Sequence, residues 1–288
     1  MTGWGMRYFF FCLLFSFAWA AQGVPFRLAT WNAHNYFDAI DDRYADQVPG
    51  APEVERKTQQ LALALRQINA DAIALQEVEK RALLEQLAQA SGYRYALLVE
   101  GNDQVRGIYV ALLSRHKPVG FRSHKNDALP YVEGNRRDVR FSRDCLEVHL
   151  GPPLPMVILV NHLKSKVGRG KSSELKRRAQ ALRLQEVVLE LRRSQPSRPV
   201  AVVGDMNDDP DSWPLEPLTR PPLVDPFRAL PLQQRYTLKH RGKGVALDHI
   251  LLTPDLAARV VPGSPKVGRL GLFHDCSDHW PLWLDLRP

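Results

Sequence analysis

The protein has 288 residues, and its 39 Lys and Arg residues outnumber its 31 Asp and Glu residues, which gives a formal net charge of +8. With 44% hydrophobic and 24% charged residues, the composition is that of a globular protein and excludes a disordered chain, a collagen-like repeat and a disulfide-rich scaffold. The positive charge favours a partner of negative charge, such as nucleic acid, an anionic membrane surface or a phosphorylated metabolite.

The first twenty residues have the pattern of a secretory signal peptide. Arg7 precedes an apolar run, residues 8–19, that is shorter than the roughly 17–25 residues needed to span a bilayer. Ala18-Trp19-Ala20 has the small-x-small form of a cleavage site. We therefore expect cleavage after Ala20, a secreted or periplasmic location without stable membrane insertion, and a mature chain of residues 21–288.

Strand-like and helix-like segments alternate along the mature chain, which indicates a layered α/β fold. We expect one domain, because no independent core lies beyond the Pro-rich connection at 210–231. The predicted strands are 26–31, 72–75, 93–99, 108–113, part of 139–150, 156–160, 200–203, 245–252 and 282–284. The predicted helices are one after Pro52, with Val54, Leu61, Leu65 and Ile68 on one face, and those at 81–90 and 172–193.

Two cysteines, Cys145 and Cys276, remain after removal of the signal peptide. In an oxidising compartment they either form one disulfide with each other or stay unpaired and pack as small hydrophobic residues, and the sequence leaves both alternatives open.

Short polar clusters follow six of the apolar segments. In α/β proteins, side chains just past strand ends converge on one crevice. Each cluster alone is explained by turn or surface positions, but six in one chain indicate an active site. Their oxygen-rich side chains, without a thiolate cluster, suit Mg²⁺, Mn²⁺ or Ca²⁺ rather than structural zinc. The clusters contain Asn32, Glu77, His162, Asp205 with Asn207, Asp248 with His249, and Asp278 with His279.

These clusters belong to six ordered motifs, which are ATWN (29–32), LQEV (75–78), NHLKS (161–165), GDMND (204–208), LDHILL (247–252) and SDHWP (277–281). With these motifs, over nearly all of the mature sequence, the chain resembles the endonuclease/exonuclease/phosphatase superfamily of deoxyribonuclease-like, metal-dependent phosphoesterases. The resemblance implies a four-layer α/β sandwich of two packed mixed β-sheets flanked by helices, with an active site at one edge of the sheets.

The resemblance also implies roles for the metal and the attacking water. Glu77 is the principal metal carboxylate, with Asn32 and Asp278 around the same Mg²⁺, Mn²⁺ or Ca²⁺ ion, directly or through water. Asp205 and Asn207 either activate and orient the attacking water or hold a second ion.

The histidines are assigned in the same way. His279 contacts the scissile phosphate or acts as a general base, and Asp248 orients it. His162 lies near the leaving oxygen, and Glu100 is either its carboxylate partner or a loop residue. His249 is expected to be structural.

The substrate is inferred from cationic segments. A basic strip from Lys164 to Arg178 adjoins His162. Such a strip can follow a phosphate backbone. As a separate feature, the run 160–166 resembles the corresponding segment of secreted bacterial nucleases. A second basic segment contains Arg136, Arg137, Arg140 and Arg143. The predicted substrate-binding residues are Lys164, Lys166, Arg169, Lys171, Arg177 and Arg143.

The sequence thus predicts a monomeric, secreted nuclease that cleaves DNA, with RNA as a further candidate, and that has little sequence preference. Two alternatives stay open: a phosphatase or phospholipase C-type phosphodiesterase acting on inositol phosphates or sphingomyelin, and a non-catalytic binding module. The module is expected to have lost part of the Glu, Asp and His set, which is complete here. Trp213 and Trp280 flank catalytic motifs and are expected to pack in the core.

Overall fold

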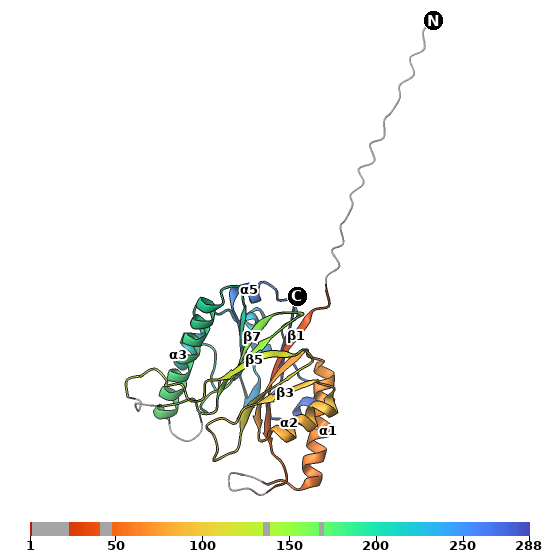
Figure 1. Cartoon of the computed structure of the whole chain (residues 1–288), viewed down its shortest axis with the longest axis vertical. Helices are drawn as coiled ribbons and strands as arrows, with labels where there is room; N and C mark the ends of the chain where they lie inside the picture. Colours follow the sequence, from red (N-terminus) through yellow and green to blue (C-terminus); the bar gives the residue numbers. More distant parts are fainter. Residues whose placement is uncertain (2–22, 41–47, 135–138, 167–169) are drawn as a thin grey trace.

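The computed structural model describes residues 1, 23–40, 48–134, 139–166 and 170–288. They form two mixed β-sheets packed face to face, with α3 on one outer face and α1 and α2 on the other (Figure 1). The predicted four-layer sandwich is confirmed. The predicted signal peptide lies outside the described residues, apart from Met1, and so do Arg136, Arg137 and Arg169.

The first sheet is built around β1, which runs parallel to β2 and antiparallel to β13. β2 is buried along its whole length, as its apolar sequence predicts for a strand covered on both faces. The strand order is β12 (Lys266–Val267), β13 (Leu282–Leu286), β1 (Phe26–Tyr36), β2 (Ala72–Val78), β4 (Tyr109–Ser114) and β3 (Tyr95–Leu98).

The second sheet is built around β7 and β8, which are parallel and wholly buried. Its strand order is β11 (Asp248–Leu252), β8 (Val200–Asp205), β7 (Met156–His162), β6 (Cys145–Leu150) and β5 (Pro118–Ser123). A separate two-stranded hairpin consists of β9 (Leu238–His240) and β10 (Lys243–Val245). The sequence predictions missed β5, β9, β12 and all of β10 except Val245, and only the final residues of the predicted 139–150 segment form a strand.

Helices cover the outer faces because their apolar residues recur at helical spacing. Leu61, Leu65 and Ile68 of α1 pack on the first sheet, and α1 ends at Asn69, which has left-handed backbone angles. None of the helices in the described ranges is long and apolar enough to cross a membrane. The helices are α1 (Ala51–Ile68), α2 (Arg81–Ser91), α3 (Lys171–Ser194), α4 (Leu232–Arg235), α5 (Pro254–Ala257) and α6 (Gly271–His274), with 3₁₀ turns η1 (Trp213–Thr219) and η2 (Pro226–Ala229).

Three apolar layers hold the sandwich together, one between the sheets and one beneath the helices on each side. The Pro-rich segment 210–231 belongs to this packing, because Leu215 and Leu218 lie in the layer beneath α3. Cys145 lies in that layer too, whereas Cys276 lies in the layer beneath α1. Both thiols are free and buried, so the open question of a disulfide between them is answered in the negative for this structure.

Strand register brings the polar clusters to one edge of the sandwich. In the second sheet, His162 and Asp248 both pair with Asp205 from the two neighbouring strands. In the first sheet, the pairing of β1 with β2 shifts between Asn32 and Tyr36, and Glu77 has a φ of +61°. Left-handed backbone angles are costly for such a residue and are concentrated at functional sites.

Gly204 allows the close approach of β7 and β8 beside Asp205. Its φ is +132°, and a Cβ atom there would lie 2.0 Å from the Asn161 carbonyl oxygen. We expect Gly204→Ala to lower the free energy of unfolding by about 2–4 kcal/mol, measured by urea denaturation.

Gly120→Ala is the matched control in the same sheet, since a Cβ atom at Gly120 would meet nothing within 4 Å. We expect it to change stability by no more than about 0.5 kcal/mol. Equal stability of both variants would contradict the close approach.

Candidate active site

A cavity of about 390 Å³ opens where the polar clusters meet. Eight of the predicted site residues line it, and they come from both sheets and from segments far apart in the sequence. Asn32 and Asp248 are buried directly behind this lining and bond to it. The eight lining residues are Glu77, Arg143, His162, Lys166, Asp205, Asn207, Asp278 and His279.

His279 and Asp248 form a buried pair on one side of the cavity. The His279 Nδ1 atom lies 2.7 Å from Asp248 Oδ2, which leaves Nε2 toward the cavity, 4.0 Å from Asp205 Oδ2. Burial alone lowers the pKa of His279, but the charge and hydrogen bond of Asp248 outweigh it and raise this pKa to about 10. The pair therefore holds a cationic imidazole that can donate a hydrogen bond from Nε2.

Asp205 is held at the centre of the site through both carboxylate oxygens. Its Oδ1 accepts a hydrogen bond from the Asn207 backbone N–H (2.8 Å), and its Oδ2 accepts one from Asn32 Nδ2 (3.0 Å). Burial, with a smaller contribution from the Asp248 charge, raises the pKa of Asp205 to about 7. Asn207, in left-handed backbone angles, also donates from Nδ2 to the Leu163 carbonyl oxygen.

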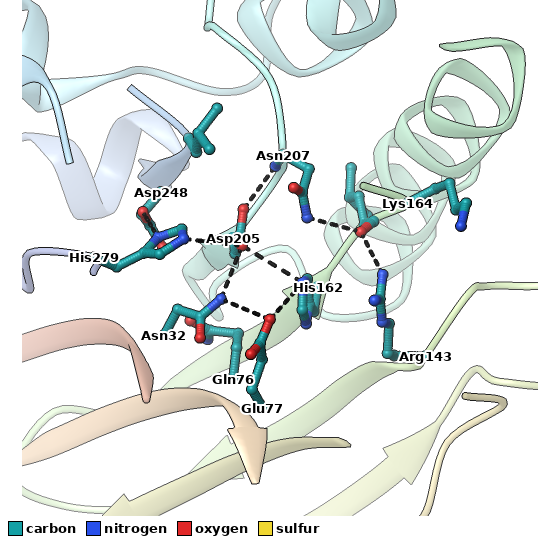
Figure 2. A network of polar contacts seen from close by, with 12 residues as sticks. Asn32, Gln76, Glu77, Arg143, His162, Lys164, Asp205, Asn207, Asp248 and His279 are labelled. Atoms are coloured by element: carbon teal, nitrogen blue, oxygen red, sulfur yellow. Dashed lines mark hydrogen bonds and ion pairs between the residues drawn. The ribbon is translucent and has the colours of Figure 1, made fainter. Parts of the chain in front are cut away.

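Asn32 connects the two sheets at this site (Figure 2). Its Nδ2 donates to Glu77 Oε1 (3.3 Å) as well as to Asp205, while its Oδ1 accepts from the His34 backbone N–H. The amide oxygen is thus turned away from the carboxylates. Through these hydrogen bonds Asn32 links Glu77 to Asp205. A contact between Asn32 and a metal ion, directly or through water, stays a prediction.

His162 completes the buried set. Its Nε2 lies 3.5 Å from Asp205 Oδ2 and 3.9 Å from Glu77 Oε1. Burial, reinforced by the charge of Arg143, lowers the pKa of His162 well below its usual value, so the ring is neutral. The suggested pairing with Glu100 is wrong, because Glu100 is exposed and His162 Nδ1 has no hydrogen-bond partner among the described residues.

The donor set fits a divalent cation that prefers oxygen ligands. Asp205, Asp248 and His279 place one ligand atom each within 4.8 Å of one another. Asp248 Oδ2 and His279 Nδ1 bond to each other, and the carboxylates that line the cavity, Glu77, Asp205 and Asp278, are the candidate ligands. Several carboxylates buried together carry negative charge that a cation would offset.

Asp278 is the least fixed of the predicted ligands. Its side chain is 52% exposed, and its Oδ1 lies 3.7 Å from His34 Nδ1. It lines the catalytic cavity and also a neighbouring cavity of about 730 Å³. The structure thus places Asp278 beside Glu77 at the mouth of the site and not within its buried part.

The predicted cationic contacts separate into surface and interior residues. Lys166 and Lys171 are exposed, Lys164 is half-buried, and Lys166 Nζ lies 2.5 Å from Asp208 Oδ1. Arg143 is buried in the cavity wall, where its guanidinium contacts Asp103 and donates to the Leu163 carbonyl oxygen. It therefore faces the site and does not belong to a surface strip.

Arg177 was predicted to contact substrate, and this prediction is wrong. Its side chain is 4% exposed, and its Nε donates to Asp208 Oδ2 (3.0 Å). Its Nη1 donates to the Lys164 carbonyl oxygen (3.0 Å). Since Asp208 Oδ2 and the Lys164 carbonyl use these donors inside the protein, Arg177 joins the loops that follow His162 and Asn207.

Sequence reasoning missed Arg106, which lines the cavity and donates to Asn35 Oδ1 (3.1 Å). It lies in an irregular loop without a motif, so only the folded structure could reveal it.

His249 is buried and bonded to the Asp208 carbonyl oxygen, which supports the structural role expected for it. Trp280 is buried as expected, whereas Trp213 is 47% exposed beneath the Arg178 guanidinium.

Residues 29–279 match the Endonuclease/Exonuclease/phosphatase family. The chain belongs to this family. Its fold is similar to that of truncated Caenorhabditis elegans TDP2, at 18% identity over 93% of this chain and 99% of that one, with a TM-score of 0.62. No curated protein matches the sequence.

Two further structures share the fold of the family. The human Nocturnin catalytic domain with bound sulfate anion is 18% identical over 91% of this chain and 93% of that one, with a TM-score of 0.62. The Bacteroides vulgatus endonuclease/exonuclease/phosphatase is 17% identical over 92% and 99%, with a TM-score of 0.63. The chain therefore has the phosphoesterase fold of this family and a group of side chains able to hold a metal ion.

Asp248→Asn tests the buried pair directly. The substitution keeps the shape of the side chain but removes its charge, so the pKa of His279 should fall toward the value of a free imidazole, about 6.5. The measurement is an NMR titration of the metal-free protein. Asp255→Asn removes an exposed carboxylate at the start of α5 and should leave the His279 titration unchanged. An unaltered titration in Asp248→Asn would disprove the assignment.

Arg177→Met tests the internal role of that residue. It leaves buried Asp208 without its guanidinium partner, which should lower the free energy of unfolding by about 3 kcal/mol. Lys171→Met, on the exposed start of the same helix, should change it by about 0.5 kcal/mol or less. If Arg177→Met were fully stable and only weakened substrate binding, the original surface role would be restored.

Proposed function

We propose that the protein is a secreted, divalent-metal-dependent nuclease that hydrolyses phosphodiester bonds of DNA, and of RNA as a second substrate, with little sequence preference. The observation that carries this proposal is the assembly of the complete acid, amide and histidine set around one cavity, next to cationic side chains. Secretion rests on the signal-peptide pattern of residues 1–20.

The reaction is an in-line attack of water on phosphorus. Asp205 accepts a proton from the water, and Asn207 keeps Asp205 in position through its backbone N–H. The new phosphorus–oxygen bond forms as the bond to the leaving oxygen breaks, and the proton taken up by Asp205 passes to that oxygen through His162, whose Nε2 lies 3.5 Å from Asp205 Oδ2. A divalent cation would be held by Glu77, with Asp278 at the rim of the cavity, and would supply positive charge that stabilises the transition state.

The histidines have different tasks because their environments differ. His279, kept cationic by Asp248, donates from Nε2 to a non-bridging phosphoryl oxygen. His162, kept neutral by burial beside Arg143, faces the leaving oxygen. Environments that push the pKa values of two titratable groups apart are typical of acid–base sites.

Cations at the mouth of the cavity favour nucleic acid. Arg106 and Lys166 line it, and Lys171 lies exposed at the start of α3. Phosphate backbones are bound chiefly by such side chains. The ion pair between Lys166 and Asp208 connects the mouth of the cavity to the catalytic loops. A non-catalytic module is disfavoured because all the predicted catalytic side chains lie together.

The deciding experiment is a substrate panel with the purified mature protein. Plasmid DNA, oligonucleotide DNA, RNA, phosphoinositide and sphingomyelin are each incubated with Mg²⁺ or Mn²⁺ and with a chelator. We expect chelator-sensitive cleavage of DNA. Turnover of phosphoinositide or sphingomyelin without nucleic acid cleavage would overturn the nuclease proposal, and inertness toward the whole panel would overturn the enzymatic one.

Variants of the site sharpen this test. His279→Ala and Asp205→Ala should each reduce the rate by about 10³-fold or more, because both side chains act in the transition state. Circular dichroism checks that both variants are folded. His116→Ala, in the turn after β4, is the control and should keep the wild-type rate. Near-normal rates in either site variant would refute its assigned role.

A further inference from the structure

The β9–β10 hairpin forms part of the wall of the catalytic cavity and was not predicted from the sequence. Leu238, His240 and Val245 line the same cavity as Asp205 and His279. Leu238 also forms an isolated β-bridge with His279. The hairpin is therefore in direct contact with the catalytic histidine.

The hairpin is strongly cationic. Residues 238–247 contain Lys239, Arg241 and Lys243 and no carboxylate, and these three side chains are exposed. A charged run on a surface is usually only solvated, but these cations alternate with residues that line the catalytic cavity, and Lys239 lines the neighbouring cavity.

We propose that this hairpin is a second substrate-binding element, which holds the phosphodiester chain on the side of the scissile bond opposite the α3 lysines. This inference rests on the proposed nuclease function and narrows its substrate to a polynucleotide held on both sides of the bond that is cut.

The two faces of β9 line different cavities. Side chains alternate along a strand, so Lys239 points away from the face of Leu238 and His240. Lys239 lines the neighbouring cavity of about 730 Å³, where its Nζ lies 5.9 Å from the centre of the Trp280 ring. The hairpin thus separates two cavities that both include Asp278.

The base of the hairpin is fixed to the catalytic pair. Thr237 is fully buried, and its Oγ1 accepts from the backbone N–H groups of Leu247 (3.1 Å) and Asp248 (3.2 Å). The Thr237 carbonyl oxygen accepts from the Trp280 N–H (2.7 Å). Backbone contacts therefore connect the hairpin to Asp248 and to the residue after His279.

The rest of the hairpin packs against its neighbour and closes in a tight turn. A Cβ atom on Gly244 would lie 2.5 Å from the Tyr236 ring, so the strand packs closely against that ring. Arg241 and Gly242 form a two-residue turn, both with positive φ, which matches the twist of paired strands. The exposed cations thus lie on a paired hairpin that packs against Tyr236.

Cationic groups lie on both sides of the reacting centre. Figure 2 shows Lys164 and Arg143 on one side of Asp205, with His279 and Asp248 on the other. The hairpin is joined to the second side, whereas Lys166 and Lys171 extend the first. A small phosphodiester carries its charge at the scissile group, but a polynucleotide has a phosphate at every residue and can reach both cationic sides.

The test compares a triple variant, Lys239→Ala with Arg241→Ala and Lys243→Ala, on oligonucleotide DNA and on bis(p-nitrophenyl) phosphate. We expect kcat/KM for DNA to fall by about tenfold or more and to depend less steeply on salt, with a slope reduced by about 2–3. Turnover of the small phosphodiester should stay within about twofold of wild type, because it does not reach the hairpin cations.

The matched control also removes three exposed cations, through Lys117→Ala, Arg193→Ala and Arg259→Ala. These residues lie away from the cavity, at the turn after β4, the end of α3 and the segment after α5. This control should keep both the DNA rate and the salt slope close to wild type.

Four results would overturn the proposal. Equal losses on DNA and on the small phosphodiester would show that the hairpin only maintains the fold of the site. Equal salt slopes for the hairpin variant and the control would remove any special role of its charge. Cleavage of phosphoinositide without cleavage of DNA by the wild type would refute the nuclease function itself, whereas normal DNA cleavage by the hairpin variant would refute the hairpin proposal alone.

Discussion

The burial of several carboxylates at one edge of two packed sheets is the constraint on which the rest of the site depends. Glu77, Asp205 and Asp248 are nearly or fully buried there, and taking such charges out of water costs several kcal/mol each. The fold tolerates this arrangement because Asn32 donates to two of the carboxylates and His279 bonds to the third. The remaining negative charge makes the site receptive to a cation.

The same electrostatic constraint explains the opposite behaviour of the two histidines. Asp248 stabilises the cationic form of His279, whereas His162 lies beside Arg143 and has no carboxylate bonded to its Nδ1. The two rings lie on either side of Asp205, with Nε2 atoms 4.0 Å and 3.5 Å from its Oδ2. One carboxylate is therefore placed between a donor imidazole and a neutral one, an arrangement suited to moving a proton during hydrolysis.

The layered fold and the central site residues could be predicted because their signals are local. An apolar strand followed by a polar residue predicts both a buried element and the side chain at its end, which holds for β1, β2, β7 and β8. The failures involve contacts between distant segments. Nothing in the order of residues distinguishes buried Arg177 from exposed Lys171, and Arg106 belongs to no motif. The hairpin was missed because β9 and β10 have only three residues each.

Some of the basic residues lie in the interior and others on the surface, so only part of the net positive charge is available to a substrate. Arg143 donates a hydrogen bond to the Leu163 carbonyl oxygen, and Arg177 donates one to the Lys164 carbonyl oxygen. These two cations therefore hold the loop after His162 in place. Exposed cations beside the cavity, on the hairpin and at the start of α3, are the ones that can respond to a substrate. Because the hairpin is bonded to the backbone of Asp248, a substrate held there would be positioned relative to the Asp248–His279 pair. Under the proposed function, selectivity among phosphoesters would therefore depend on how far the charge of the substrate extends beyond the scissile bond, because the catalytic residues contact only the scissile group.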